Sequence, residues 1–229
     1  MSAEKERLIR LLKEAGFLRS ESVERAFRLV PREEFVPEDL RSLAYADRPL
    51  PIGFGQTISA PSIVVYMTEL LDASRGMKVL EVGTGSGYQA AVLAEIVAPT
   101  GAPRTEWGHV WTIEIIEELA ERAKRNLERA GYSDRVTVIV GDGSKGYPRE
   151  APYHRIMVTA ASPDVPRPLV GQLVVGGRMV VPVGDLVSQT LMVVERRPEG
   201  IKSKSVLDVV FVPLRGEYGW KNYETRMFT

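Results

Sequence analysis

A glycine-rich turn in the middle of the chain, Gly83-Thr84-Gly85-Ser86-Gly87, carries the clearest chemical signal in the sequence. An apolar run ends at the first of these glycines, and a helical pattern follows the last. Glycines let a ligand lie against the main chain, and a helix N-terminus offers free N–H groups. The G-x-G-x-G spacing is not the dinucleotide fingerprint, and no Lys-Ser/Thr pair of a phosphate-binding loop follows. The turn predicts a ligand site, although packing a helix against a strand is the alternative.

Acidic residues follow the next two apolar runs. Glu114 ends the run WTIE and precedes Ile115, while Asp142 lies in Gly141-Asp142-Gly143, directly after VTVIV. A carboxylate at the tip of the second strand can accept both hydroxyls of a ribose, and one after the third strand can accept an adenine amino group. Each acid also has a local interpretation, Glu114 as a cap for the helix near Ile116 and Asp142 as a turn residue. Together with the glycine turn, they predict a nucleoside site at the carboxyl ends of three strands.

The elements that position these residues alternate between short apolar runs and helical periodicity, which predicts a parallel sheet covered by helices. We expect an α/β fold, namely a Rossmann-like, doubly wound, mostly parallel sheet with helices on both faces, an N-terminal helical extension and C-terminal antiparallel strands. One domain is expected over residues 1–229, with a helical and loop region at 1–59, a cofactor-binding core at 60–184 and C-terminal strands and tail at 185–229. Strands are expected at 77–82, 109–114, 136–140, 155–160, 178–183 and 190–195, and a helix at 60–72.

The composition excludes several kinds of site. The chain has 229 residues, a formal net charge of zero, no cysteine and two histidines. Thiol nucleophiles, disulfides and cysteine-based zinc sites are therefore excluded, and no metal is expected. Zero net charge disfavours a nucleic-acid surface. The charged N-terminus is unlike a signal peptide, and no apolar run approaches the roughly 20 residues of a membrane span, so we expect a cytoplasmic protein with neither nucleic acid nor membrane as partner.

The sequence resembles the protein-L-isoaspartate O-methyltransferase family of S-adenosylmethionine-dependent methyltransferases over nearly its whole length. The glycine turn is shared by many methyltransferases, whereas QTISAP, VTAA and FVPL are much more specific. The motifs that carry the resemblance are VPREEFVP (30–37), GQTISAP (55–61), LEVGTGSGY (80–88), WTIE (111–114), GDGSKGY (141–147), APYHRIMVTAA (151–161), GGRMVVPVG (176–184) and VVFVPL (209–214).

The resemblance implies methyl transfer from S-adenosylmethionine to the free α-carboxylate of isoaspartyl residues in damaged proteins and peptides. The ester then collapses to a succinimide, S-adenosylhomocysteine being the other product. It implies that Ser59 is the catalytic residue and that Thr57 and Ser59 contact the substrate. The cofactor would be held by Gln56, Thr57, Ile58, Gly83, Thr84, Gly85, Ser86, Gly87, Glu114, Ile115, Asp142 and Gly143, and the peptide also by Val212, Pro213 and Leu214. The alternative is a methyltransferase that uses the same cofactor on RNA or a small molecule.

The implied chemistry suits a chain that lacks an obvious general base. A carboxylate is already anionic at neutral pH and needs only to be placed in line with the methyl group. Ser59 has a second interpretation as the N-cap of the helix expected at 60–72. Strand addition of an extended peptide is expected along residues 212–214, a segment that can instead be a buried edge strand. Tyr218, Trp220 and Tyr223 are expected to pack against the body of the protein, a C-terminal lid being the alternative.

Two features depart from the family pattern. His154 follows Ala-Pro-Tyr where the family usually has aspartate, so the role of that acid does not carry over. Residues 98–108 form a loop rich in proline and glycine, which predicts a surface insertion.

Overall fold

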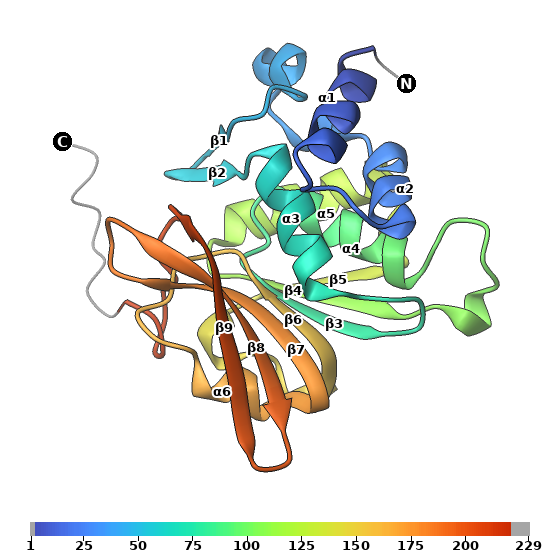
Figure 1. Cartoon of the computed structure of the whole chain (residues 1–229). Helices are drawn as coiled ribbons and strands as arrows, with labels where there is room; N and C mark the ends of the chain where they lie inside the picture. The colour runs from blue at the N-terminus through green and yellow to red at the C-terminus, as the bar shows by residue number, and fades with distance from the viewer. Residues whose placement is uncertain (1–2, 221–229) are drawn as a thin grey trace.

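The computed structural model describes residues 3–220 and begins with two helices, α1 (Ala3–Glu14) and α2 (Glu21–Leu29). The apolar residues of both helices recur at helical spacing, and the buried face of α2 includes Val23, Ala26 and Phe27. The hydroxyl of Ser20 caps α2 by accepting a hydrogen bond from the backbone N–H of Val23. These helices form the N-terminal extension that the sequence predicts (Figure 1).

Residues 32–58, a segment with several prolines for which the sequence predicts no helix or strand, contain only short elements. Two 3₁₀ turns, η1 (Arg32–Phe35) and η2 (Glu38–Leu43), are followed by a small antiparallel hairpin of β1 (Leu50–Gly53) and β2 (Gln56–Ile58). The hairpin turns through Gly53, Phe54 and Gly55, all with positive φ. The hairpin projects beside the main body of the protein (Figure 1). Its strand β2 contains the first three residues of the QTISAP motif, and the proline of the motif begins α3 (Pro61–Leu71).

A seven-stranded sheet forms the centre of the protein, in the order β5-β4-β3-β6-β7-β8-β9. The first five strands of this order are parallel, and β8 and β9 run antiparallel to their neighbours. The mostly parallel sheet with an antiparallel edge confirms the expected fold class. The strands are β3 (Lys78–Val82), β4 (His109–Glu114), β5 (Val136–Val140), β6 (Tyr153–Val158), β7 (Leu173–Gly184), β8 (Gln189–Arg197) and β9 (Gly200–Val209).

Helices cover the two faces of the sheet unequally (Figure 1). One face carries α3, α4 (Tyr88–Val97) and α5 (Glu117–Arg129), with α1 and α2 packed outside them. The other carries the short α6 (Arg167–Gly171) and the 3₁₀ turns η4 (Gly143–Lys145) and η5 (Pro148–Glu150). Alternation within β3 divides the core, since Val79 packs among the residues of the first face and Leu80 among those of the second.

The strand β9 is absent from the sequence prediction. Its residues GIKSKSVLDV are mostly exposed, so they lack the apolar run by which the other strands are recognised. The alternative interpretation of VVFVPL as a buried edge strand is wrong beyond its first residue. Only Val209 belongs to β9, and the chain then leaves the sheet so that Pro213 pairs with Ala161 in an isolated bridge.

His154 has a structural role at the amino end of the sheet. Its Nδ1 accepts a hydrogen bond of 3.0 Å from the backbone N–H of Lys78, which begins β3. An aspartate is also an acceptor, which explains how histidine replaces the usual family residue.

The surface loop at 98–108, which contains η3 (Arg104–Glu106), is tied to the core by the fully buried Glu95. Its carboxylate accepts from the N–H and the hydroxyl of Thr100 and pairs with Arg25 and Arg135. Within residues 3–220, no helix has the length and apolar character needed to cross a membrane.

Candidate functional site

The glycine turn connects β3 to α4 at the carboxyl edge of the sheet. Gly83, Gly85 and Gly87 all have positive φ, which side-chain-bearing residues rarely adopt. A Cβ at Gly83 would lie 2.4 Å from Oγ1 of Thr159, so only glycine lets the turn approach the loop after β6. Gly87 is the N-cap of α4 and faces Leu127 of α5. The turn therefore serves both as a pocket wall and as a packing element. Its first residues line a pocket, and its last glycine lets α4 pack against α5.

The carboxylate of Glu114 bridges the glycine turn and the start of α5. One oxygen accepts from the N–H of Gly85 at 2.9 Å, and the other accepts from the N–H of Ile116 at 3.1 Å. The N-cap of α5 is Ile116, and no side chain caps this helix, so the capping interpretation of Glu114 is wrong. The oxygen bound to Gly85 fixes the glycine turn, and the residue as a whole lines the pocket.

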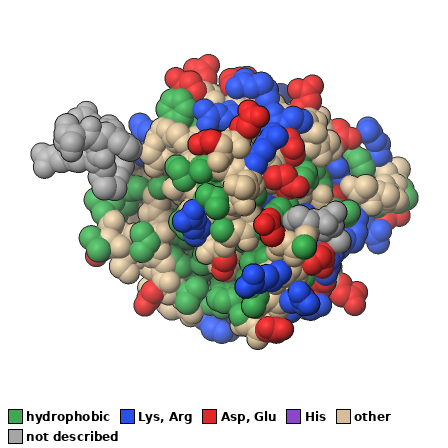
Figure 2. Space-filling view, turned by 90° about the horizontal axis from the view of Figure 1, so that it is seen from above, with side chains coloured by type: hydrophobic (Ala, Val, Ile, Leu, Met, Phe, Trp, Pro, Cys, Tyr) green, Lys and Arg blue, Asp and Glu red, His purple; other side chains and the backbone are tan. Residues whose placement is uncertain are grey.

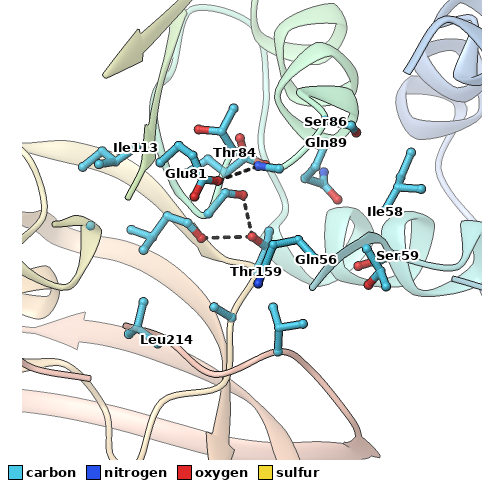
Figure 3. A pocket seen from close by; sticks show the side chains of 18 of the residues that line it. Gln56, Ile58, Ser59, Glu81, Thr84, Ser86, Gln89, Ile113, Thr159 and Leu214 are labelled. Atoms are coloured by element: carbon cyan, nitrogen blue, oxygen red, sulfur yellow. Dashed lines mark hydrogen bonds between the residues drawn. The ribbon is translucent and has the colours of Figure 1, made fainter. Parts of the chain in front are cut away.

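This pocket, which we call the sheet-edge pocket, is a cleft of about 900 Å³ including its open mouth. Ile113 and Glu81 lie on one side of the hollow, Ser59 and Ile58 on the other, and Thr159 between them (Figure 3). The pocket brings together most of the residues expected to hold the cofactor, namely Gln56, Thr57, Ile58, Gly83, Thr84, Gly85, Ser86, Glu114, Ile115 and Gly143, with Ser59, Val212, Pro213 and Leu214.

Asp142 is an expected cofactor residue that the structure places outside the walls of this pocket. One carboxylate oxygen accepts from the N–H and hydroxyl of Ser144, and the other accepts from the N–H of Glu217 at 2.9 Å. Asp142 thus acts as a turn residue that also fastens the C-terminal segment. Its neighbour Gly143 does line the pocket, and a Cβ there would lie 2.7 Å from a methyl group of Val82.

The sequence analysis missed Glu81, which lies within β3 and is fully buried. Oε2 accepts from the hydroxyl of Thr112, which in turn lies 2.7 Å from the hydroxyl of Thr84. Oε1 has no partner although it is buried and belongs to a pocket wall. Burial raises the pKa of Glu81 to about 8. An acid near the end of a largely apolar strand, two residues before the glycine turn, is the signal that could have revealed it.

Thr159 is a second missed residue, placed directly after β6. Its hydroxyl donates to the carbonyls of Val82 and Gly83, at 3.0 and 2.6 Å. It thereby closes the end of β3 against the end of β6. Its position inside the VTAA motif is the only sequence signal for it.

Ser59 connects β2 to α3, and the structure contradicts its role as a helix cap. The N-cap of α3 is Ala60, without a side-chain hydrogen bond, and Asp47 instead accepts from the N–H of Ser62. The fully buried guanidinium of Arg32 donates to the carbonyl of Ser59 at 2.8 Å and to that of Ala44. The backbone of Ser59 is therefore fixed while its half-buried side chain faces the pocket.

A second hollow, which we call the outer pocket, adjoins the first and has a volume of about 1470 Å³ including open solvent. Its rim carries exposed apolar side chains, among them Phe54, Leu186 and Val210. Figure 2 shows hydrophobic side chains gathered at the left and lower centre of this face, and mixed charges mainly over its top and right. Seven residues line both pockets, namely Gln56, Thr57, Ser59, Thr159, Val212, Pro213 and Arg215.

Residues 212–214 form part of the wall between the two pockets. The carbonyl of Val212 accepts from the N–H of Ala161, and the N–H of Leu214 donates to the carbonyl of Ala161, both at 2.7 Å. Trp220 extends this packing by donating from Nε1 to the same carbonyl, whereas Tyr218 is exposed. Tyr223 lies outside the described residues.

Comparisons with known proteins point to one family. The family model for protein-L-isoaspartate(D-aspartate) O-methyltransferase (PCMT) matches residues 3–219. The chain is 64% identical over 219 residues to a protein-L-isoaspartate O-methyltransferase of Hyperthermus butylicus, covering 95% of this chain and 91% of the relative. It is 60% identical over 220 residues to the protein of that name from Staphylothermus marinus, covering 96% and 97%.

Solved structures show the same architecture. A protein-L-isoaspartate O-methyltransferase with 33% identity superposes with a TM-score of 0.81, covering 94% of this chain and 67% of that one. A Plasmodium falciparum protein solved with S-adenosyl-L-homocysteine shares the fold, with a TM-score of 0.80 at 24% identity and coverage of 94% and 99%. By its sequence motifs, its sheet and these relatives, the chain belongs to the protein-L-isoaspartate(D-aspartate) O-methyltransferase family.

Proposed function

We propose that this protein transfers a methyl group from S-adenosylmethionine to the α-carboxylate of isoaspartyl residues in damaged proteins and peptides, and so starts their repair. The observation that carries the proposal is the junction of two pockets at Ser59, one lined by buried polar groups and the other by apolar side chains of loops. At this junction, S-adenosylmethionine in one pocket can meet a peptide that lies in the other.

The residues of the sheet-edge pocket fit S-adenosylmethionine. Glu114 stands at the tip of β4, where it can accept the hydroxyls of a ribose. The unpartnered oxygen of Glu81 can accept from the ammonium of the methionine moiety, because buried acceptors need a donor. Gly143 keeps the wall after β5 open beside Val82, where an adenine ring would lie. The bound cofactor supplies an electrophilic methyl group on a sulfonium centre.

The residues at the junction act on the acceptor. The attacking carboxylate is already ionised, so this site needs to orient it and exclude water but not to remove a proton. We infer that the Ser59 hydroxyl donates to one carboxylate oxygen and leaves the other free to attack, since Ser59 lines both pockets. Arg32 supports this role by fixing the backbone of Ser59.

The outer pocket suits an extended peptide whose sequence varies. The bonds to Ala161 use one edge of residues 212–214, and alternate residues of an extended segment face opposite sides. The carbonyl of Pro213 therefore remains on the other edge, available to a peptide N–H. Recognition through backbone groups explains how one site accepts many damaged proteins.

The alternative acceptors, RNA or a small molecule, fit the outer pocket less well. Of the residues described, its walls carry two charged side chains of opposite sign, Asp208 and Arg215, unlike the basic track that RNA requires. The cytoplasmic location stays a prediction from the sequence.

The direct test is an assay with two peptides that differ only in the linkage at one residue, isoaspartyl or normal aspartyl, together with labelled S-adenosylmethionine. We expect methylation of the isoaspartyl peptide alone, and an ester that decays to a succinimide. Equal methylation of both peptides, or of neither, contradicts the proposed function.

A further inference from the structure

Arg215 is the cationic side chain at the point where the two pockets join. It lines both of them, and the other charged residues in their walls are the acids Glu81, Glu114 and Asp208. Its side chain is exposed. Within residues 3–220, no hydrogen bond or ion pair engages its guanidinium.

The backbone beneath Arg215 is held in place although the side chain is free. The preceding residue, Leu214, donates to Ala161 and accepts from the N–H of Trp220 at 2.8 Å, and Arg215 itself bridges Trp220. A long cation thus extends from a fixed point at the pocket junction, which is the arrangement expected of a binding group and not of a mobile loop.

Apart from the buried Glu81, the acids near the junction are engaged with other partners. Glu217, two residues away, pairs with Lys145 at 2.7 Å. Glu114 accepts from two backbone N–H groups, and Asp208 accepts from the hydroxyl of Thr190. Among residues 3–220, no carboxylate pairs with the guanidinium of Arg215, so an anionic group of a bound peptide can do so.

We propose that Arg215 selects substrates by binding a second carboxylate, that of an acidic residue beside the isoaspartyl residue. This inference rests on the proposed function. The accepting carboxylate is a poorer partner, because it loses its charge on methylation and a cation beside it opposes that loss. A flanking carboxylate keeps its charge throughout, so its pairing with Arg215 stabilises ground state and transition state equally. Such pairing lowers KM and leaves kcat unchanged.

The test uses isoaspartyl peptides that carry Glu, Gln or Lys on the N-terminal or C-terminal side of the damaged residue. We compare each Glu peptide with the Gln peptide that has its substitution on the same side. For the unaltered protein and the side that gives the larger effect, we expect the KM of the Glu peptide to be about three- to fivefold lower, as for one exposed ion pair. High salt should shrink the difference. Arg215→Gln should abolish it, and Arg215→Glu should turn the preference toward Lys.

Arg149→Gln is the matched control, since it makes the same change of net charge on an exposed residue of η5 outside both pockets. It should keep the preference for Glu. Two results overturn the role of Arg215 and leave the methyltransferase proposal intact. One is a preference for Glu that survives Arg215→Gln, and the other is a KM that this variant raises equally for the Glu, Gln and Lys peptides. Absence of methylation of every isoaspartyl peptide, with the protein folded, overturns both.

Discussion

The two pockets that meet at Ser59 are built in different ways. The sheet-edge pocket is formed largely by the ends of consecutive parallel strands and contains buried polar groups such as Glu81 and Thr84. The outer pocket is formed by the hairpin turn at Phe54, the β7–β8 loop at Leu186 and the chain after β9. The difference teaches that a fixed cofactor is held by groups set by the sheet, whereas a variable peptide meets loops with exposed apolar side chains.

The largest expected effect concerns a buried group of the sheet-edge pocket. Glu81→Gln should weaken S-adenosylmethionine about 10- to 100-fold, because a hydrogen bond to a charged group contributes about 1.5–3 kcal/mol. Titration calorimetry measures this, with S-adenosylhomocysteine as a second ligand. Undiminished affinity for both would show that Glu81 serves only the network with Thr112.

The same variant tests the pKa of Glu81, which burial raises from 4.5 to about 8. Between these values the folded protein binds more protons than the unfolded chain, so the free energy of unfolding should fall as pH rises through this window. Glu81→Gln should remove this component of the slope. Denaturant unfolding of both proteins between pH 5 and 8.5 measures it, and parallel slopes would contradict the assignment.

A smaller effect is expected at the junction of the pockets. Ser59→Ala should lower kcat for an isoaspartyl peptide about tenfold, the size of one hydrogen bond to a carboxylate. Since Ala60 and not Ser59 is the N-cap of α3, the Tm should shift by less than about 2 °C. The reverse pattern, a lower Tm with unchanged kcat, would restore a structural role for the hydroxyl.

The smallest effect belongs to a residue remote from both pockets. His154→Ala should lower the free energy of unfolding by about 1 kcal/mol, because the N–H of Lys78 loses its acceptor. His154→Asp supplies a new acceptor and should lose less. Both variants should keep the kcat of the unaltered protein, and a fall in kcat would show that the amino end of the sheet influences the pockets.

The sequence revealed those parts of the site that follow from local pattern. Gly83, Glu114 and Gly143 lie at or just after the ends of three apolar runs, and this places them at one edge because parallel strands share a direction. Ser59 was assigned through a family motif and not through its neighbours. The exposed strand β9 escaped prediction because its polar residues leave no periodic signal.

The sequence by itself determined the parallel sheet, the edge at which a nucleoside can bind and the family of the chain, because strand periodicity and glycine turns are local properties. Tertiary structure alone decided that Glu81 is buried with one oxygen unpartnered and that Asp142 binds the N–H of Glu217. It also decided that Arg215 stands between two pockets with no carboxylate partner in the part of the chain that the structure describes. These are relations among groups far apart in the chain, and their energies depend on burial and on partners that only folding brings together.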